Sequence, residues 1–301
     1  MLLRKKQNKS YSLIFDYLIE KSFLIISITS LLILFAIMLF LIKEGIPLFK
    51  DVGIFDFIFG KEWYPVSDNI RLGIFPLIIS SIYITILASI IAIPISLATA
   101  IYIAEISKGK VKEIIKSLIE IIASIPSVVI GFLGMVVVAP FLIKNFNINS
   151  GLNLLNASLL LAFTAIPTIT SISEDAISSI PMSLKEASFA LGANKWQTVV
   201  RIVIPASLSG IWTAIILGIS RIIGETMIVL MVAGGAAVIP KSIFDPVRPL
   251  TSNVAAEMAE AAVGGIHYRA LFAIGIILFI ITFIFNITAD YLSNKYKFKN
   301  K

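Results

Sequence analysis

Long stretches of apolar residues dominate the chain, and they recur six times between shorter polar connections. Each stretch reaches about 20 residues, roughly 30 Å of helix, which is enough to cross the hydrocarbon core of a bilayer. The pattern therefore predicts six membrane-spanning helices. They are expected at residues 22–42, 74–104, 121–143, 153–173, 207–233 and 270–289. The second is long enough to tilt, to kink at Pro94, or to begin as an interfacial piece near Pro76.

Lysine and arginine are unevenly distributed over the connections. Sixteen of the 25 lie in the N-terminal tail, the 105–120 and 174–206 loops and the C-terminal tail, and eight lie in the other connections. Because cytoplasmic segments are enriched in these residues, we expect both termini and the 174–206 loop in the cytoplasm. The apolar core near the N-terminus is too long for a cleavable signal peptide. Residues 1–43 are therefore expected to remain as a tail and anchor helix.

Composition agrees with this class and excludes several kinds of chemistry. The chain is 58% hydrophobic and 14% charged, whereas a soluble domain carries about 25% charged residues. It has no cysteine and one histidine, His267, so neither a thiolate site nor a histidine-cluster metal site is expected, and no cofactor is. The net charge of +7 is explained by lysines flanking the spans rather than by nucleic acid. No phosphate-binding loop follows Gly60 or Gly109, so the chain is not expected to hydrolyse ATP by that route.

The loop at 174–206 has the pattern of a helix, a turn and a second helix. Residues 183–191 are expected to form the first helix, Gly192 permits a tight turn, and Asn194 is a plausible N-cap for a helix at 195–203. Such a knob would offer Phe189, Leu191 and Trp196 to a partner. On the residue pattern alone, an ordinary amphipathic interfacial loop is an equally good interpretation.

The motif EASFALGA at 186–193, followed by Ile204 and Pro205, resembles the "EAA" coupling motif of bacterial ABC-importer permeases. In that family the motif docks into a cleft on a cytoplasmic ATPase subunit. The resemblance implies an all-α integral membrane protein with six spans and the type I (MetI-like) permease fold, with its permease core at 74–290. It also implies that the coupling contact is made by Glu186, Ala187, Ala190, Gly192 and Ala193.

Three further stretches resemble one branch of that family, the PstC-type permeases of the phosphate-specific importer. They are FDFIFGKEWYP at 55–65, GETMIVLMVAGG at 224–235 and EMAEAAVGGIHYRALFAIGIILFIIT at 257–282. One departure is Gly235, where asparagine would be expected. The resemblance implies a heterodimer with a PstA-type sister permease, two PstB-type ATPase subunits and an extracytoplasmic PstS-type phosphate-binding protein. It makes the chain a permease subunit without covalent chemistry of its own.

Two charged residues, Arg221 and Glu225, interrupt the fifth apolar stretch. A charge at mid-membrane costs about 2.5–3.5 kcal/mol on insertion scales, so such residues usually face a bundle interior or a water-filled cavity. Three interpretations stay open: an ion pair within one helix, a pair that holds or gates the dimer interface, and a substrate-pathway site that includes Thr226. For an anion pathway, arginine offers a fixed charge with a fork of donors, and a carboxylate can accept a hydrogen bond from protonated phosphate but not from sulfate.

Other polar residues are weaker pathway candidates, because serine and threonine in membrane helices more often bond to their own backbone. They are Ser80, Ser81, Thr85, Thr164, Thr168, Thr170 and Ser171.

Pro167 is expected to kink the fourth span, and a short helix is expected between Ala255 and Gly265. His267 and Arg269 are expected at the external mouth, as interfacial anchors or as contacts for the binding protein or incoming phosphate. A permease for molybdate, sulfate or phosphonate and an ion-driven secondary carrier remain the alternatives; the carrier would show an inverted repeat.

Overall fold

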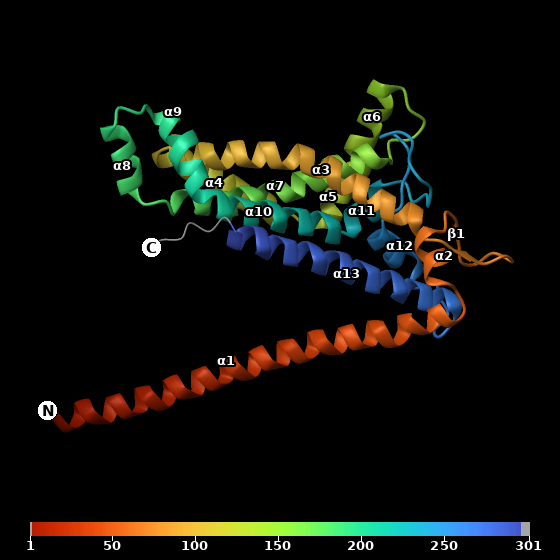
Figure 1. Cartoon of the computed structure of the whole chain (residues 1–301), viewed down its shortest axis with the longest axis horizontal. Helices are drawn as coiled ribbons and strands as arrows, with labels where there is room; N and C mark the ends of the chain where they lie inside the picture. The colour runs from red at the N-terminus through yellow and green to blue at the C-terminus, as the bar shows by residue number, and fades with distance from the viewer. Residues whose placement is uncertain (1, 296–301) are drawn as a thin grey trace.

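The computed structural model describes residues 2–295, and these residues are helical over most of their length (Figure 1). Six helical segments are long and apolar enough to cross a membrane, which confirms the predicted number. They are Tyr17–Lys50, Phe75–Ile106, Ser127–Phe146, Leu154–Ser178, Lys195–Gly224 and Ile266–Thr288. Of the lysines in the C-terminal tail on which the predicted orientation partly rests, Lys297, Lys299 and Lys301 lie outside the described residues.

The elements follow one another with short connections. They are α1 (Leu2–Gly45), η1 (Ile46–Lys50), α2 (Ile54–Phe59), β1 (Trp63–Tyr64), β2 (Arg71–Leu72), α3 (Phe75–Ile101), η2 (Tyr102–Ile106), α4 (Gly109–Ser124), α5 (Ser127–Leu133), η3 (Gly134–Val138), α6 (Ala139–Phe146), α7 (Leu154–Ser178), α8 (Met182–Ala190), α9 (Lys195–Thr198), η4 (Val199–Val203), α10 (Ile204–Gly224), α11 (Met227–Val232), α12 (Leu250–Glu257) and α13 (Ile266–Lys295). The segments η2, η3 and η4 are π-helical, and η1 is a 3₁₀ helix.

The third span differs from its expected bounds. The apolar pattern places its start near residue 121, but α4 ends at Ser124 and the spanning segment begins at Ser127. The reason is Pro126, since a proline disfavours helical backbone in the residue before it; Ile125 is accordingly extended, with φ −66° and ψ 127°. The lysine-rich 105–120 segment, which was expected to be a loop, is therefore mostly helix.

Prolines elsewhere are accommodated within the spanning helices. Pro76 lies in the first turn of α3, where the missing N–H costs no intrahelical bond, and α3 continues through Pro94 to Ile101. Pro167 likewise lies inside α7. The second stretch is therefore one long helical segment without a separate interfacial piece at Pro76.

Helices α3, α7 and α10 pack together as the core of the bundle. Small residues allow close approach: Ala88 and Ala92 of α3 are fully buried, and a Cβ added at Gly218 of α10 would lie 2.3 Å from Ile169 of α7. In membrane proteins, where lipid is as apolar as leucine, such close packing supplies much of the attraction between helices. Helix α13 lies along α10 on the outside of this core.

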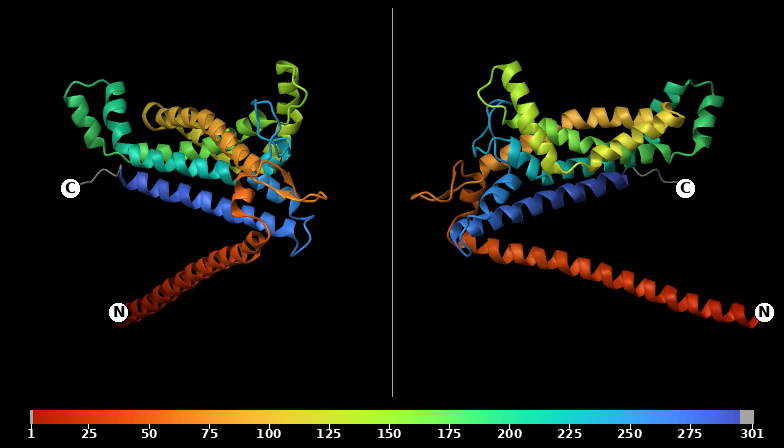
Figure 2. Two further views of the ribbon diagram at one scale, coloured as in Figure 1. Left: turned by 45° about the vertical axis from the view of Figure 1, so that its right-hand side comes forward. Right: turned by 180° about the vertical axis from the view of Figure 1, so that it is seen from behind.

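Helix α1 diverges from the bundle. It meets α13 near its C-terminal end, where Phe40 makes an edge-to-face contact with Phe272 at 5.3 Å and Gly45 approaches Ile276. From there it runs away from the other helices, and both views in Figure 2 show the widening gap. None of its most apolar 18-residue window is buried within the chain.

The bundle has two distinct ends (Figure 1). One, the loop end, carries the connection with α8 and α9. The other, the cap end, carries residues 46–74, in which β1 and β2 form a two-stranded antiparallel hairpin with Trp63 opposite Leu72 and Tyr64 opposite Arg71. The cap has its own apolar core, in which the fully buried Phe57 packs with Trp63 and Leu72.

Candidate functional site

The 174–206 loop has the helix–turn–helix form that its sequence predicts. Helix α8 ends at Ala190, and Gly192 then adopts a φ of 83°, a left-handed backbone that glycine enters without steric cost. Asn194 caps α9 through a complete capping box: its side chain accepts from the Gln197 N–H at 2.8 Å, and the Gln197 side chain accepts from the Asn194 N–H at 2.9 Å.

The second helix of the loop, however, is not separate. It was expected to end at Val203, but α9 continues through η4 directly into α10, and Pro205 occupies the first turn of α10, where proline is tolerated. The result is one continuous 30-residue segment from Lys195 to Gly224. The loop is therefore joined to the residues at the far end of α10 by one continuous helical segment.

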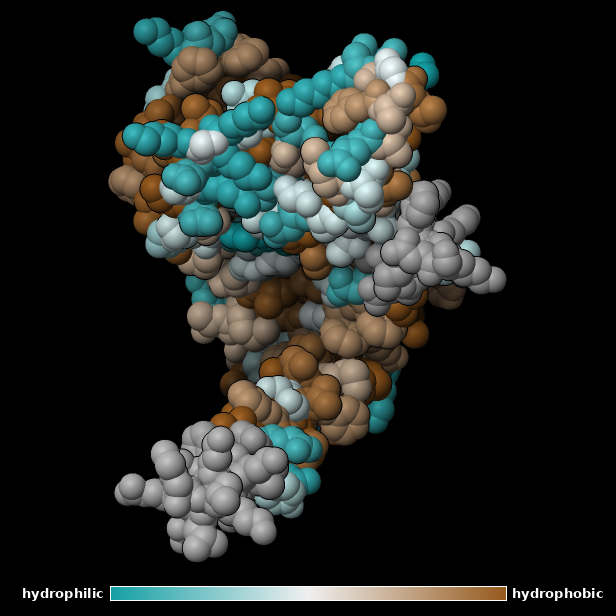
Figure 3. Space-filling view, turned by 90° about the vertical axis from the view of Figure 1, so that its left-hand side faces the viewer, coloured by the Kyte–Doolittle hydropathy of each residue, from teal (hydrophilic) through white to brown (hydrophobic). Residues whose placement is uncertain are grey.

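The side chains of the EASFALGA motif lie at the surface of the loop end. Glu186, Ala187, Ala190 and Gly192 are exposed, and Ala193 is half-buried. Ser188 is the buried member of α8, and its hydroxyl hydrogen-bonds to that of Thr198 in α9 at 2.9 Å. Phe189, Leu191 and Trp196 expose large apolar surfaces, with Leu191 90% exposed. In Figure 3, which views this end, hydrophilic side chains cover the upper part of the face, where Figure 1 places α8 and α9.

Arg221 and Glu225 are not an ion pair within one helix. Helix α10 ends at Gly224, and Glu225 has extended backbone with φ −70° and ψ 130°. Among the ion pairs of residues 2–295, none joins these two side chains. The interpretation of a neutralised pair on one helical face is therefore wrong, because the helix stops between the two charges.

Glu225 instead caps the start of α11. Its Oε1 accepts hydrogen bonds from the backbone N–H groups of Thr226 (3.1 Å), Met227 (3.1 Å) and Ile228 (3.4 Å). A carboxylate at a helix N-terminus satisfies the free N–H groups and meets the positive end of the helix dipole. Within the described residues these bonds use Oε1 and none reaches Oε2. Thr226 is half-buried, and its hydroxyl donates to the Gly224 carbonyl at 3.2 Å.

Arg221 is exposed on the surface of this chain and is held by α7. Its Nη1 donates to Thr168 Oγ1 at 3.0 Å. Thr168 lies 14 residues from the start of α7 and 10 from its end, or about 21 Å and about 15 Å along the helix. The guanidinium therefore lies near the middle of the bundle's depth. Beside it, Gly224 is open, since a Cβ added there would meet nothing within 4 Å.

Helix α12 is hydrogen-bonded to the break between α10 and α11. Thr251 Oγ1 donates to the Glu225 carbonyl at 3.0 Å, and the N–H of Leu250 donates to Ser81 Oγ of α3 at 3.0 Å. Backbone groups at helix ends have no partner within the helix. These two bonds therefore satisfy the Leu250 N–H at the start of α12 and the Glu225 carbonyl after the end of α10. Helix α12 ends at Glu257, and turns follow it. The helix expected between Ala255 and Gly265 is therefore misplaced, and the helical part lies earlier.

Helix α12 ends at Glu257, whose carboxylate is the meeting point of several side chains. The sequence alone did not indicate this role. Glu257 accepts hydrogen bonds from Trp63 Nε1 (3.0 and 3.1 Å) and Arg248 Nη1 (2.6 Å), and His267 Nε2 lies 2.9 Å from its Oε2. Arg248 also donates through Nε to the Gly235 carbonyl at 2.6 Å. The signal was present in the sequence, because Trp63, Glu257 and His267 all fall in stretches that resemble the PstC-type permeases.

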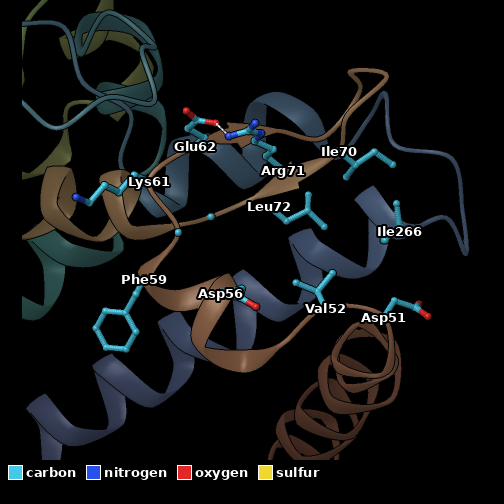
Figure 4. A pocket seen from close by; sticks show the side chains of 12 residues that line it. Asp51, Val52, Asp56, Phe59, Lys61, Glu62, Ile70, Arg71, Leu72 and Ile266 are labelled. Carbon is cyan, nitrogen blue, oxygen red and sulfur yellow. Dashed lines mark hydrogen bonds and ion pairs between the residues drawn. The ribbon is translucent and has the colours of Figure 1, made fainter.

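The cap also contains an open hollow of about 790 Å³ (Figure 4). Glu62 and Arg71, which form an exposed ion pair, border it on the hairpin side, and Asp51 and Asp56 lie on the opposite side. Arg269 lies 3.7 Å from Asp51. The two residues expected at the external mouth thus have partners within the chain: His267 pairs with Glu257 and Arg269 with Asp51.

Most of the weaker polar candidates bond to nearby backbone. Ser80, Thr85 and Thr164 donate to carbonyls three or four residues back in their own helices, and Thr170 donates to the Ser96 carbonyl at 3.4 Å. Ser81 donates to the Leu77 carbonyl at 2.9 Å and also accepts from the Leu250 N–H, whereas Thr168 accepts from Arg221. Ser171 is exposed on α7.

The chain has relatives whose family is known. A model of the family described as binding-protein-dependent transport system inner membrane component matches residues 92–298. The chain belongs to this family. The permease is 36% identical over 264 residues to the probable ABC transporter permease protein YqgH of Bacillus subtilis (strain 168), covering 87% of this chain and 85% of the relative.

Two other relatives of the permease carry phosphate in their names. It is 33% identical over 257 residues to the phosphate transport system permease protein PstC of Mesorhizobium japonicum, covering 79% of this chain and 78% of the relative. It is 32% identical over 304 residues to the PstC protein of Pasteurella multocida, covering 94% and 93%. The predicted resemblance to the PstC-type permeases is confirmed.

Solved structures confirm the fold of the permease. The inward-facing MetNI methionine ABC transporter matches with a TM-score of 0.57 and 19% identity, over 72% of this chain and 93% of that chain. The bacterial alginate ABC transporter in complex with an alginate pentasaccharide-bound periplasmic protein matches with a TM-score of 0.66 and 15% identity, over 94% and 96%. The chain is a multi-pass membrane protein with the type I ABC-importer permease fold.

Proposed function

We propose that this permease is one half of the translocation pathway of an ATP-driven importer of inorganic phosphate. The observation that carries the proposal is the placement of Arg221, a fixed positive charge near the middle of the bundle's depth, beside the open backbone of Gly224 and the carboxylate of Glu225. The relatives named as phosphate permeases support the choice of anion.

The three residues Arg221, Glu225 and Thr226 have complementary roles in this pathway. The guanidinium of Arg221 offers several donors in a fork that matches phosphate oxygens. Glu225 keeps its Oε1 on the α11 N-terminus and presents Oε2, which accepts a hydrogen bond from the O–H of protonated phosphate. Sulfate has no such proton at neutral pH, so it meets a repelling charge at the same point. Thr226 sits at the hinge between the two helices.

The partners follow from the two ends of the bundle. The loop end, with Glu186, Ala187, Ala190, Gly192 and Ala193, faces the cytoplasm and contacts a PstB-type ATPase subunit, which supplies ATP hydrolysis. The cap end faces outward toward a PstS-type phosphate-binding protein. A PstA-type sister permease completes the pathway opposite Arg221. In this arrangement both termini are cytoplasmic, residues 1–43 are the tail and anchor helix, residues 74–290 are the permease core, and the complex lies in the inner or plasma membrane.

Reconstitution tests the proposal. The permease is co-assembled with candidate sister permease and ATPase subunits in liposomes, the binding protein is added outside, and uptake is measured with and without ATP. We expect ATP-dependent uptake of phosphate that excess sulfate, molybdate or phosphonate does not suppress. Uptake of one of those anions in preference to phosphate would reassign the substrate. Uptake by the permease alone, independent of ATP, would instead indicate an ion-driven carrier.

A further inference from the structure

Helix α8 is attached to the rest of the molecule by few side chains. Ser188 is its buried residue, and the hydrogen bond from Ser188 to Thr198 stays within the 174–206 loop. Among the side-chain hydrogen bonds and ion pairs that α8 makes with residues 2–295, one leaves the loop: Lys185 Nζ donates to Glu105 Oε1 at 2.6 Å, across 80 positions of sequence. Lys185 directly precedes Glu186, the first residue of the coupling motif.

The Lys185–Glu105 pair is shielded from solvent. The lysine side chain is 14% exposed and the glutamate side chain 9% exposed. Pairs on an open surface contribute little because water and salt screen them, whereas removing one member of a buried pair leaves an uncompensated charge. The pair is therefore a firm attachment point. Since Glu105 lies in η2, the direct continuation of α3, it joins α8 to α3.

A second buried carboxylate, Glu174, pairs with α4, the helix that follows η2. Glu174, 2% exposed near the end of α7, forms ion pairs with Lys112 (3.1 Å) and Lys116 (2.5 Å) of α4 and accepts a hydrogen bond from Ser178 (2.8 Å). The hydrogen bond to Glu174 raises the pKa of Lys116 above its ordinary value, so this lysine stays charged. The region where α3 passes into α4 is thus paired with α7 through Glu174 and with α8 through Lys185.

Besides its direct chain connection to α7, helix α8 has two further routes into the membrane helices, and each of these passes through a π-helical segment. The covalent route runs through α9 and η4 (Val199–Val203) to α10. The ionic route runs through Lys185 and Glu105 in η2 (Tyr102–Ile106) to α3. Short π-helical stretches inside α-helices are frequent at functional sites. At the far ends, α10 carries Arg221, and α3 carries Ser81, which bonds to α12 beside Glu225.

We propose that Lys185 and Glu105 are positioning residues that transmit the movement of α8 to α3, so that an ATPase subunit drives α3 and α10 together. The proposal rests on the proposed function, in which α8 contacts the ATPase. Without the pair, α8 still moves α10 but no longer moves α3 with it. ATP is then hydrolysed with less transport, although the ATPase subunit still docks.

Charge exchange tests the pair. Lys185→Glu and Glu105→Lys are made singly and together in the complete reconstituted complex, with Lys195→Gln, an exposed lysine in the same loop, as the control. We expect each single variant to lower the phosphate carried per ATP hydrolysed several-fold at unchanged co-purification of the ATPase, and the double variant to recover most of it. A double variant no better than the single variants would overturn the proposal. So would a defect in Lys185→Gln that Glu105→Gln does not share, because Lys185 would then act on the ATPase directly.

A second measurement does not depend on the substrate. The chain has no cysteine, so spin labels at Ser183→Cys in α8 and Tyr102→Cys in η2 are unique when cysteine-free partner subunits are used. We expect the distance between the labels to stay fixed on ATP binding in the otherwise unchanged protein and to change in Glu105→Gln. A distance that changes equally in both would overturn the transmission role, even if phosphate proved to be the wrong anion.

Discussion

The indole Nε1 of Trp63 lies 3.0 Å from Oε2 of Glu257, and this bond joins the cap hairpin to the end of α12. Arg248 and His267 meet the same carboxylate, so three side chains converge on one residue, and Trp63 comes from 194 positions away in the sequence. The other end of α12 bonds to Glu225 through Thr251. The cap is thereby connected, through one short helix, to the break that carries the proposed anion site.

Replacing Trp63 by phenylalanine is expected to destabilise the cap. An aromatic ring remains, but it is smaller than the buried indole and has no N–H, so the Glu257 carboxylate loses a donor. Hydrogen bonds to charged groups contribute about 1.5–3 kcal/mol. The expected result is a lower unfolding midpoint of the purified permease in detergent. Glu62→Gln is the matched control, because it breaks an exposed pair with Arg71 that should contribute about 0–1 kcal/mol. Equal midpoints for the two variants would contradict the central role of Glu257.

Arg221 offers a test of the anion site. Arg221→Gln removes the charge, and we expect phosphate uptake to fall at least tenfold while the complex still assembles, because this side chain is exposed and not part of the core. Arg221→Lys keeps the charge but loses the planar fork, so intermediate uptake is expected. Initial uptake rates in liposomes measure both variants. Uptake at the original rate in Arg221→Gln would remove Arg221 from the pathway.

Glu225→Gln separates the capping role of this residue from its proposed role in selectivity. The amide oxygen of glutamine can still accept from the α11 N–H groups, so the break between the helices should persist. The negative charge and the second acceptor oxygen are lost, and we expect excess sulfate to compete with phosphate uptake in this variant but not in the original protein. Glu225→Ala should in addition lose the cap, at a cost of about 0.5–2 kcal/mol. Unchanged discrimination in Glu225→Gln would contradict the proposed recognition of the phosphate proton.

The turn at Gly192 gives a test of the loop. An L-residue with a side chain is strained in left-handed backbone by about 1–2 kcal/mol, so Gly192→Ala should loosen the junction of α8 and α9. The expected result is less ATPase subunit recovered with the permease on purification. Gly192→Asn is the control, since asparagine tolerates this backbone better than alanine does. If both variants retained the ATPase equally, the backbone geometry at this position would not matter for docking.

The six spans and the loop motif were predictable because hydrophobicity and turn chemistry are local signals. The end of α10 was not, since the apolar residues resume at Met227 directly after Gly224, Glu225 and Thr226, and so short a polar interruption did not indicate that the helix stops there. Helix α4 was taken for a loop because lysine content indicates only the side of the membrane. The convergence on Glu257 could not be derived from spacing, because its partners lie 194, 10 and 9 positions away.

The divergence of α1 has a consequence for how this sequence tolerates change. Over the part of α1 from Tyr17 to Leu34, every side chain is exposed within the chain, so no shape has to fit a neighbour in the same subunit. In α3 and α7, by contrast, an exchange at Ala88 or Ile169 must fit a packed site. A library of random apolar replacements should therefore leave the free part of α1 functional far more often than the core helices. The positions of α1 that resist exchange would mark where another subunit touches it.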